Sequence, residues 1–287
     1  MTQELLTPVQ GIRRELQRIV RGYIVGEDQP PMRPTASDDS WFGPNSVAWI
    51  IHTDWATLIG GIESLLVQTL HPPTMAGVAD HSDYKSDPFG RLNRTAQFIG
   101  MTIFGSAEEA QRSVDIVRTI HDRIEGHTPD GRPYRANDSE NLLWVHATEV
   151  DGFLRGVQRY GSSTITPAMA DQYVAEMARV GEALGIDRAP RSVAELDATL
   201  RQYRPHLHFG SQARDTVRWL AFPPNSLAAQ GPYAILLSAA VAMLPSWARR
   251  KLWIPPTLPP VNRLLVEPAA KSVVRTLDWI MVPEAAA

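Results

Sequence analysis

Histidine is the residue type in this chain best suited to chemistry near neutral pH, because imidazole can carry a proton or bind a metal ion. The chain has eight histidines. His121 shares a helical spacing with Val114, Val117 and Ile124, which predicts apolar surroundings for its ring. A buried imidazole nitrogen without a partner costs about 1 to 3 kcal/mol. An iron or another metal ion would satisfy one nitrogen of His121.

His146 is a second candidate of the same kind. It shares a helical stripe with Leu142, Val150 and Phe153 in the segment from Trp144 to Thr148. The more ordinary role of a histidine in such a place is a hydrogen bond that joins two helices.

A third feature is the cluster of Arg91, Arg94 and Thr95 within one predicted helical turn. Such a cluster is typical of a solvated helix face. It is also typical of a buried polar group in which a guanidinium holds a carboxylate with two hydrogen bonds. Both interpretations remain open from the residues alone.

Composition narrows the chemistry. The chain has no cysteine, which excludes disulfides, thiolate catalysis, iron–sulfur clusters and thiolate-bound metals. Any metal must bind His, carboxylate or Tyr. The 28 basic and 31 acidic residues give a net charge of −3, so nucleic acid is not an expected partner.

Helices must position these residues. Ser106 and Glu109 form a predicted capping box that begins a helix over 107–125, with Gly126 as its left-handed end. A preceding helix is expected from about Pro88 to Phe104, and a later one, capped by Asp138 or Ser139, carries His146.

A second capping box, Ser192 to Glu195, predicts a helix that reaches about Tyr203. Further helices are expected over 50–70, 168–185, 211–221 and 233–244. No run of alternating β-branched residues between turn signals supports strands. The sequence therefore predicts an all-α protein that forms a single domain over residues 1–287.

Two observations concern location. The N-terminus lacks a basic region followed by an apolar stretch, so a cytoplasmic location is expected. The longest apolar run, Tyr233 to Leu244, is too short to span a membrane, which takes roughly 20 residues. We expect this run to be a buried core helix.

Several of these motifs occur together in a characteristic order. They are the segment from His71 to His81 (HPPTMAGVADH), that from Asp87 to Thr95 (DPFGRLNRT), then His121, Gly126, GRPY ending at Tyr134 and WVHAT ending at Thr148. In order and spacing the chain resembles the rubber oxygenases (latex-clearing proteins) and the MpaB-type oxygenases. The resemblance is strong over about 45–160 and extends loosely to about 250.

The resemblance implies a globin-like, all-helical protein that binds haem b and uses O₂ to cleave a carbon–carbon double bond. His121 matches the proximal ligand of the iron. Arg91 and Thr95 match a polar cluster near the haem, and His146 matches a histidine with a supporting role.

Two departures from the family pattern bear on the substrate. Arg94 stands where latex-clearing proteins have a lysine close to the iron, and an arginine stays protonated and is no neutral nitrogen ligand. The acidic residue expected before Arg91 is missing, with Asp80 the nearest carboxylate. The expected substrate is therefore a small apolar molecule, isoprenoid or aromatic, in place of rubber.

Two other functions are open at this point. The dipeptide His121-Asp122, with His81 and Asp151 as further ligands, would suit a metal phosphohydrolase of the HD type. A non-catalytic helical binding protein would show the same caps and stripes, because these specify structure and not chemistry.

Overall fold

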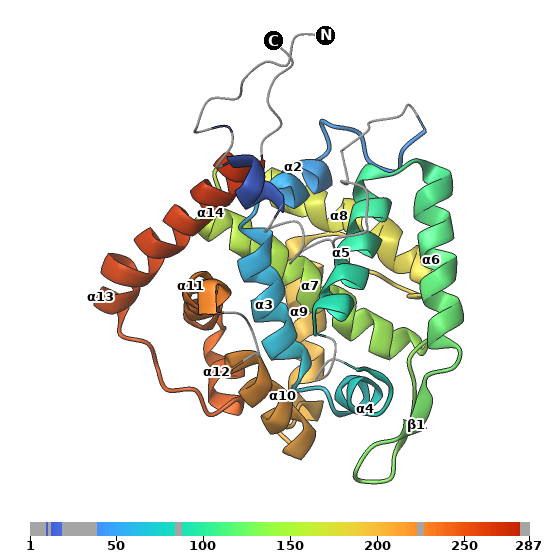
Figure 1. Cartoon of the computed structure of the whole chain (residues 1–287). Coiled ribbons are helices and arrows are strands. Elements are labelled where there is room, and N and C mark those ends of the chain that lie inside the picture. The colour runs from blue at the N-terminus through green and yellow to red at the C-terminus, as the bar shows by residue number, and fades with distance from the viewer. Residues whose placement is uncertain (1–9, 11–12, 19–38, 84–87, 223–226, 282–287) are drawn as a thin grey trace.

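Two central helices, α3 (Thr57–Gln68) and α7 (Ser139–Tyr160), lie against each other along their lengths and carry the rest of the molecule. The computed structural model describes residues 10, 13–18, 39–83, 88–222 and 227–281 (Figure 1). The elements around the two central helices are α2 (Val47–Thr53), α4 (Pro72–His81), α5 (Pro88–Phe104), α6 (Ala107–His121), β1 (Glu125–His127), β2 (Pro133–Arg135), α8 (Pro167–Leu184), α9 (Val193–Tyr203), η1 (Arg204–His206), α10 (Ser211–Ala221), α11 (Leu227–Met243), α12 (Ser246–Lys251), α13 (Pro259–Val261), η2 (Asn262–Val266) and α14 (Glu267–Met281). The all-α prediction is confirmed.

Glycines allow α3 and α7 to approach until their backbones touch. A methyl group at Gly60 would lie 2.1 Å from the carbonyl oxygen of Gly152, and one at Gly156 would lie 2.8 Å from the carbonyl oxygen of Ala56. Both distances are too short for any real side chain. The contact therefore requires glycine at these positions.

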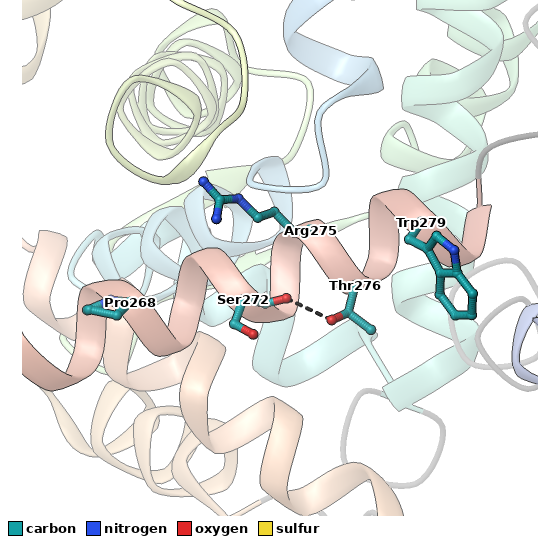
Figure 2. Close-up of a pocket in the computed structure, with 5 residues that line it drawn as sticks. All are labelled: Pro268, Ser272, Arg275, Thr276 and Trp279. Atoms are coloured by element: carbon teal, nitrogen blue, oxygen red, sulfur yellow. Dashed lines mark hydrogen bonds between the residues drawn. The ribbon is translucent and has the colours of Figure 1, made fainter.

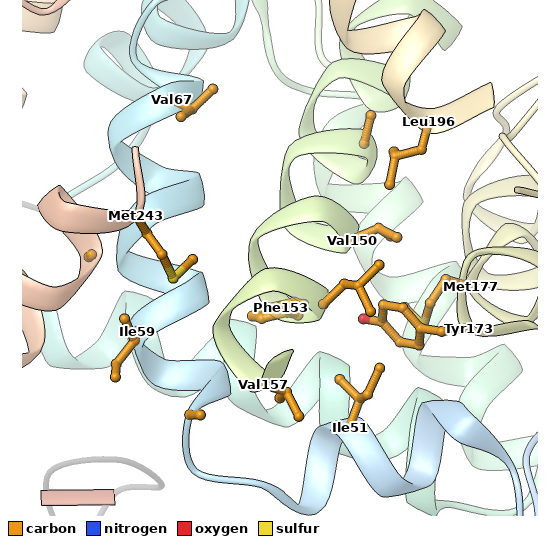
Figure 3. Close-up of a cluster of buried hydrophobic side chains, with 14 of the residues drawn as sticks. Ile51, Ile59, Val67, Val150, Phe153, Val157, Tyr173, Met177, Leu196 and Met243 are labelled. Carbon is orange, nitrogen blue, oxygen red and sulfur yellow. The ribbon is translucent and has the colours of Figure 1, made fainter. Parts of the chain in front are cut away.

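The hydrophobic core surrounds α7 on several sides. Trp144, Tyr160 and Tyr173 are its largest fully buried side chains. Figure 3 shows Val150, Phe153 and Val157 of α7 among side chains from other helices. Those neighbours include Ile51, Ile59, Tyr173, Met177, Leu196 and Met243.

Helix starts agree with the local signals in the sequence. The Ser106–Glu109 capping box has both hydrogen bonds and begins α6 at Ala107. At α9, Ser192 accepts from the amide of Glu195 as predicted, but the Glu195 carboxylate accepts from the amide of Arg191. At α7 the N-cap position belongs to Asp138, whose side chain makes no capping bond.

The predicted end of the helix over 107–125 is wrong. α6 ends at His121, and Glu125–His127 pairs antiparallel with Pro133–Arg135 in a β-hairpin. Gly126 therefore has extended backbone, without the positive φ of a helix cap. Its lack of a side chain serves another contact, because a methyl group there would lie 2.8 Å from the Tyr134 hydroxyl. These two short strands also correct the expectation of no strands.

The continuous helix expected over 50–70 is interrupted at Asp54. The buried carboxylate of Asp54 accepts from the amide of Ala56 at 2.9 Å and from the amide of Ser162 at 2.8 Å. The second bond joins this turn to the end of α7. The Asp54 side chain thus interrupts the helix and instead joins two segments that are far apart in the sequence.

The apolar run Tyr233 to Leu244 lies within α11 and the residue that follows it, and five of the last six residues of the run are buried. The helix begins earlier than predicted and contains Pro232. Among the described residues, no helix is long and apolar enough to cross a membrane.

Candidate active site

Helices α5 and α6 form an antiparallel pair joined by Gly105 and Ser106. They pack along each other and are joined at their upper ends in Figure 1. This arrangement brings the start of α5, with Arg91, and the end of α6, with His121, to the same end of the pair. Arg91 and His121 are therefore at the same end of the pair because the chain reverses direction between α5 and α6.

The described side chains in the first half of α5 are not fully buried. α5 lies mainly on α6 and touches α2, and its backbone contacts with α3 and α7 are few. Among the side chains that the structure describes in α5, the first to pack against the core is that of Phe98. The described residues from Gly90 to Gln97 are half-buried or exposed. The polar groups beneath this half-helix are the candidate site.

His121 is half-buried at the last position of α6, and its Nδ1 is buried without a hydrogen-bond partner. Burial lowers the pKa of His121, and the nearby Asn137 and Asp122 oppose that shift. The ring is therefore neutral at pH 7. A hydrogen bond from Nδ1 to the Val117 carbonyl, which is the support expected for a metal-bound histidine, is not formed.

His146 is buried and fits a packing role. Burial lowers its pKa to about 4, and its Nε2 has no hydrogen-bond partner. A methyl group at Gly181 of α8 would lie 3.1 Å from Nε2, so the ring edge lies against the α8 backbone. The space beside Nε2 is filled by α8. The described contacts favour His121 over His146 as a ligand.

The three residues of the Arg91 cluster differ in their surroundings. Arg91 is half-buried and donates to the Ser82 hydroxyl at 3.1 Å. Arg94 and Thr95 are exposed, and the Thr95 hydroxyl donates to the Arg91 carbonyl at 3.2 Å within the helix. Arg91 also acts electrostatically on the interior group described next.

Sequence reasoning missed Glu149 of α7. Burial raises the pKa of Glu149 to about 7, and the Gln68 amide and the Arg91 guanidinium oppose that rise. Nε2 of Gln68 lies near this carboxyl but has no acceptor in hydrogen-bond geometry. A carboxyl that titrates near neutral pH can take up or release a proton, which suits a general acid or base. The sequence did hold a sign of this residue, because Glu149 follows His146 by three residues and so lies on the same helix face.

A second buried pair extends this polar set. His52 of α2 lies 3.1 Å from the Tyr173 hydroxyl through its Nε2, and its ring meets Phe153 edge-on. Burial lowers the pKa of His52 to about 3. Burial also raises the pKa of Tyr173, with Glu149 adding to the shift. Tyr173 thus stays neutral near Glu149, and His52 stays neutral beside Tyr173.

Other parts of the family-like motifs hold the β-hairpin against α4. The Tyr134 hydroxyl donates to Asp80 at 2.8 Å, and His81 Nε2 lies 3.1 Å from the Glu125 carbonyl oxygen. Asp80 is thereby engaged in a structural contact. His71 packs against the rings of Trp144 and Tyr203, and its Nδ1 lies 2.8 Å from the Thr74 hydroxyl.

The residues of the HD-type alternative are not gathered. Asp151 pairs with Arg155 at 3.1 Å on the α3 side of α7, while His81 contacts the β-hairpin. Within the described ranges, no three His, Asp or Glu side chains come together as a metal site.

Comparison with known proteins gives the class. Residues 49–279 match the family described as ER-bound oxygenase mpaB/B'/Rubber oxygenase, catalytic domain. The protein is thus an oxygenase, an enzyme of the oxidoreductase class. More particularly, the chain belongs to the mpaB/rubber oxygenase family. Neither the search of curated proteins nor that of solved structures returned a match.

Proposed function

We propose that this oxygenase depends on haem b and acts with O₂ on a small apolar substrate, isoprenoid or aromatic. The observation that carries the proposal is the neutral imidazole of His121, whose buried Nδ1 lacks a partner at the end of α6 where Arg91 also lies. Family membership supplies the oxygenase chemistry.

The donor set fits such a cofactor. A haem iron binds a neutral imidazole nitrogen, and burial keeps His121 neutral. A propionate needs a cation, and Arg91 offers one from the first half of α5. His146 does not fit as the ligand, because α8 occupies the space beside its Nε2.

Each residue would then have a defined task. When bound, haem b supplies an iron that activates O₂. His121 would hold the iron, and Arg91 would pair with a carboxylate of the cofactor. The Glu149 carboxyl, with its pKa of about 7, would hold or release a proton beside the substrate. The surrounding apolar core would exclude water.

The substrate proposal draws on α4. Its one carboxylate, Asp80, is held by the Tyr134 hydroxyl and faces the β-hairpin contact. By resemblance to the family, rubber cleavage would use a free carboxylate on the helix that precedes Arg91 in the sequence. Because the only carboxylate of α4 is held by Tyr134, we favour a substrate other than rubber.

The two histidines provide the direct test. His121→Ala should purify without haem, or with haem that added imidazole restores, because the iron loses its anchor. His146→Ala should keep the haem spectrum and lose stability, because it leaves a gap against Gly181. The measurement is the ratio of absorbance near 400 nm to that at 280 nm, with circular dichroism to confirm folding.

Two outcomes would contradict the proposal. A colourless His146→Ala beside a red His121→Ala would reverse the ligand assignment. A folded wild-type protein from haem-replete cells that contains no acid-acetone-extractable pigment would remove haem from the mechanism altogether.

Arg91 tests the polar part of the site. Arg91→Leu should lower haem retention, and it should also raise the pKa of Glu149, because the Arg91 charge holds that pKa down. The pH profile of O₂-dependent activity should therefore move to higher pH. Arg94→Leu is the matched control, since Arg94 is exposed. Equal effects of the two variants on haem retention and on the pH profile would show that Arg91 has no specific role in the site.

A further inference from the structure

The segment from Leu258 to Val266 exposes a row of large apolar side chains. Leu258, Val261, Leu264 and Leu265 are 67%, 43%, 69% and 66% exposed, and we call them the leucine face. Their spacing of three, three and one places them on one side of α13 and η2. Exposed apolar side chains that gather in this way mark a contact surface.

The segment is held in place from within. Arg249 donates to the Thr257 hydroxyl at 2.8 Å, and the Asn262 amide donates to the same oxygen at 2.6 Å. Arg249 also donates to the Val241 carbonyl at 2.9 Å. The leucine face is thus fixed to α11 and presented as a preformed surface.

A basic cavity borders the same segment, with Pro259, Asn262 and Arg263 in its lining. Its volume is about 760 Å³, and its lining includes Arg159, Arg263, Lys271 and Arg275 against the single acid Glu267. Glu267 is paired with Lys271 at 3.0 Å. Within the described residues, Arg263 and Arg275 have no ion-pair partner. The cavity therefore offers at least two cations to an anionic ligand.

The hollow continues along α14. A shallower pocket of about 270 Å³ shares Pro268 and Arg275 with the basic cavity and ends at Trp279 (Figure 2). Arg275 extends from α14 on one side of the helix in this view, and Trp279 lies near its end. Trp279 is 46% exposed. Aromatic side chains of this amphipathic type favour the boundary between water and lipid.

Charge is concentrated in the same region. Residues 246–276 contain six basic residues and one acidic residue, a net charge of +5 in a chain whose total is −3. The rest of the protein is therefore acidic and would be repelled by an anionic surface. An anionic surface would therefore attract this segment more than the rest of the chain.

We propose that this side docks on a membrane that contains anionic phospholipids, with phosphate groups in the basic cavity and the leucine face at the level of the acyl chains. Free phosphate would explain the cations but not the leucines, and an apolar protein partner would explain the leucines but not the unpaired arginines. One apolar or one electrostatic contact alone gives weak membrane binding, and their combination gives stable attachment. The surface is independent of the haem proposal.

Vesicle sedimentation with the full-length protein tests the docking. Wild type should sediment with vesicles of phosphatidylcholine mixed with phosphatidylglycerol, and not with phosphatidylcholine alone. Arg263→Gln combined with Arg275→Gln should weaken binding about 30-fold. Leu264→Ser combined with Leu265→Ser should also weaken vesicle binding, and each of the two substitutions should contribute a factor of about 10 or more. High salt should reduce binding of the wild type.

Matched controls use the same substitutions elsewhere. Ile116 and Ile120 of α6 are 55% and 51% exposed, so Ile116→Ser with Ile120→Ser repeats the loss of apolar surface. Arg188→Gln with Arg201→Gln repeats the loss of two exposed cations. Both control pairs should bind like wild type.

Three results would overturn the proposal. Equal losses in test and control pairs would mean a general surface effect. Binding of inorganic phosphate without vesicle binding would make the cavity an ion site only. Light scattering that shows a wild-type dimer, a monomer for the leucine variant and no vesicle binding by either would assign the face to a second copy of this chain.

Discussion

The two sides of α7 differ in how tightly they are packed. Towards α3, glycines bring two helix backbones into contact, and Arg155 joins Glu63 and Asp151 to the carbonyl of Met243. Towards the first half of α5, the contacts are few and the groups are polar. One side of a single helix thus supplies rigidity, and the other has the polar, partly exposed surroundings that the proposed cofactor site would use.

The largest expected effect is at the glycine contact. Gly60→Val should abolish folding, because its side chain would clash with the Gly152 carbonyl and nothing nearby can yield without moving α7. Circular dichroism and solubility measure this. Gly43→Val is the control, since no atom lies within 4 Å of a side chain there. A folded Gly60→Val protein would show that the two helices can separate.

Arg155→Met should cost up to about 3 to 5 kcal/mol of unfolding free energy at pH 8, where loss of the cation leaves the buried carboxylates of Glu63 and Asp151 uncompensated. Burial raises the pKa of both carboxyls, and losing Arg155 raises them further. The cost should therefore shrink as pH falls and the carboxyls become protonated. Urea denaturation at pH 5 and pH 8 measures it. A cost independent of pH would mean that packing, and not charge, is lost.

Glu149→Gln should change the free energy of unfolding less than Arg155→Met does, and near neutral pH it should raise it. Because the folded pKa of Glu149 is raised to about 7, the native state holds a proton that the unfolded chain releases above its ordinary pKa. Wild-type stability should fall between about pH 4.5 and 7, and Glu149→Gln should remove up to about 3 kcal/mol of that fall. The same variant should lose activity if Glu149 moves a proton. Identical pH–stability curves would place the carboxyl in water.

Thr95→Val should have the smallest effect on stability, less than about 0.5 kcal/mol, because Thr95 is exposed and its hydroxyl bonds only within α5. Melting temperature measures this. A loss of activity at unchanged melting temperature would show that the exposed side of α5 also belongs to the site, which would extend the partly exposed region.

Features that depend only on neighbouring residues could be predicted from the sequence, and features that depend on contacts between distant residues could not. The capping box at Ser106 and the start of α5 at Pro88 need only neighbouring residues, and both were predicted. The end of α6 at His121 is followed by a β-hairpin that Tyr134 joins to Asp80 of α4, a contact between residues far apart in the sequence. Glu149 escaped notice because its pKa depends on helices far away in sequence.

The glycine contact has a consequence for how the molecule can move. Two backbones in direct contact can neither slide nor part by small steps, so α3 and α7 respond to thermal agitation as one body. The end of α5 that carries Arg91 is less constrained, because the described residues from Gly90 to Gln97 are half-buried or exposed.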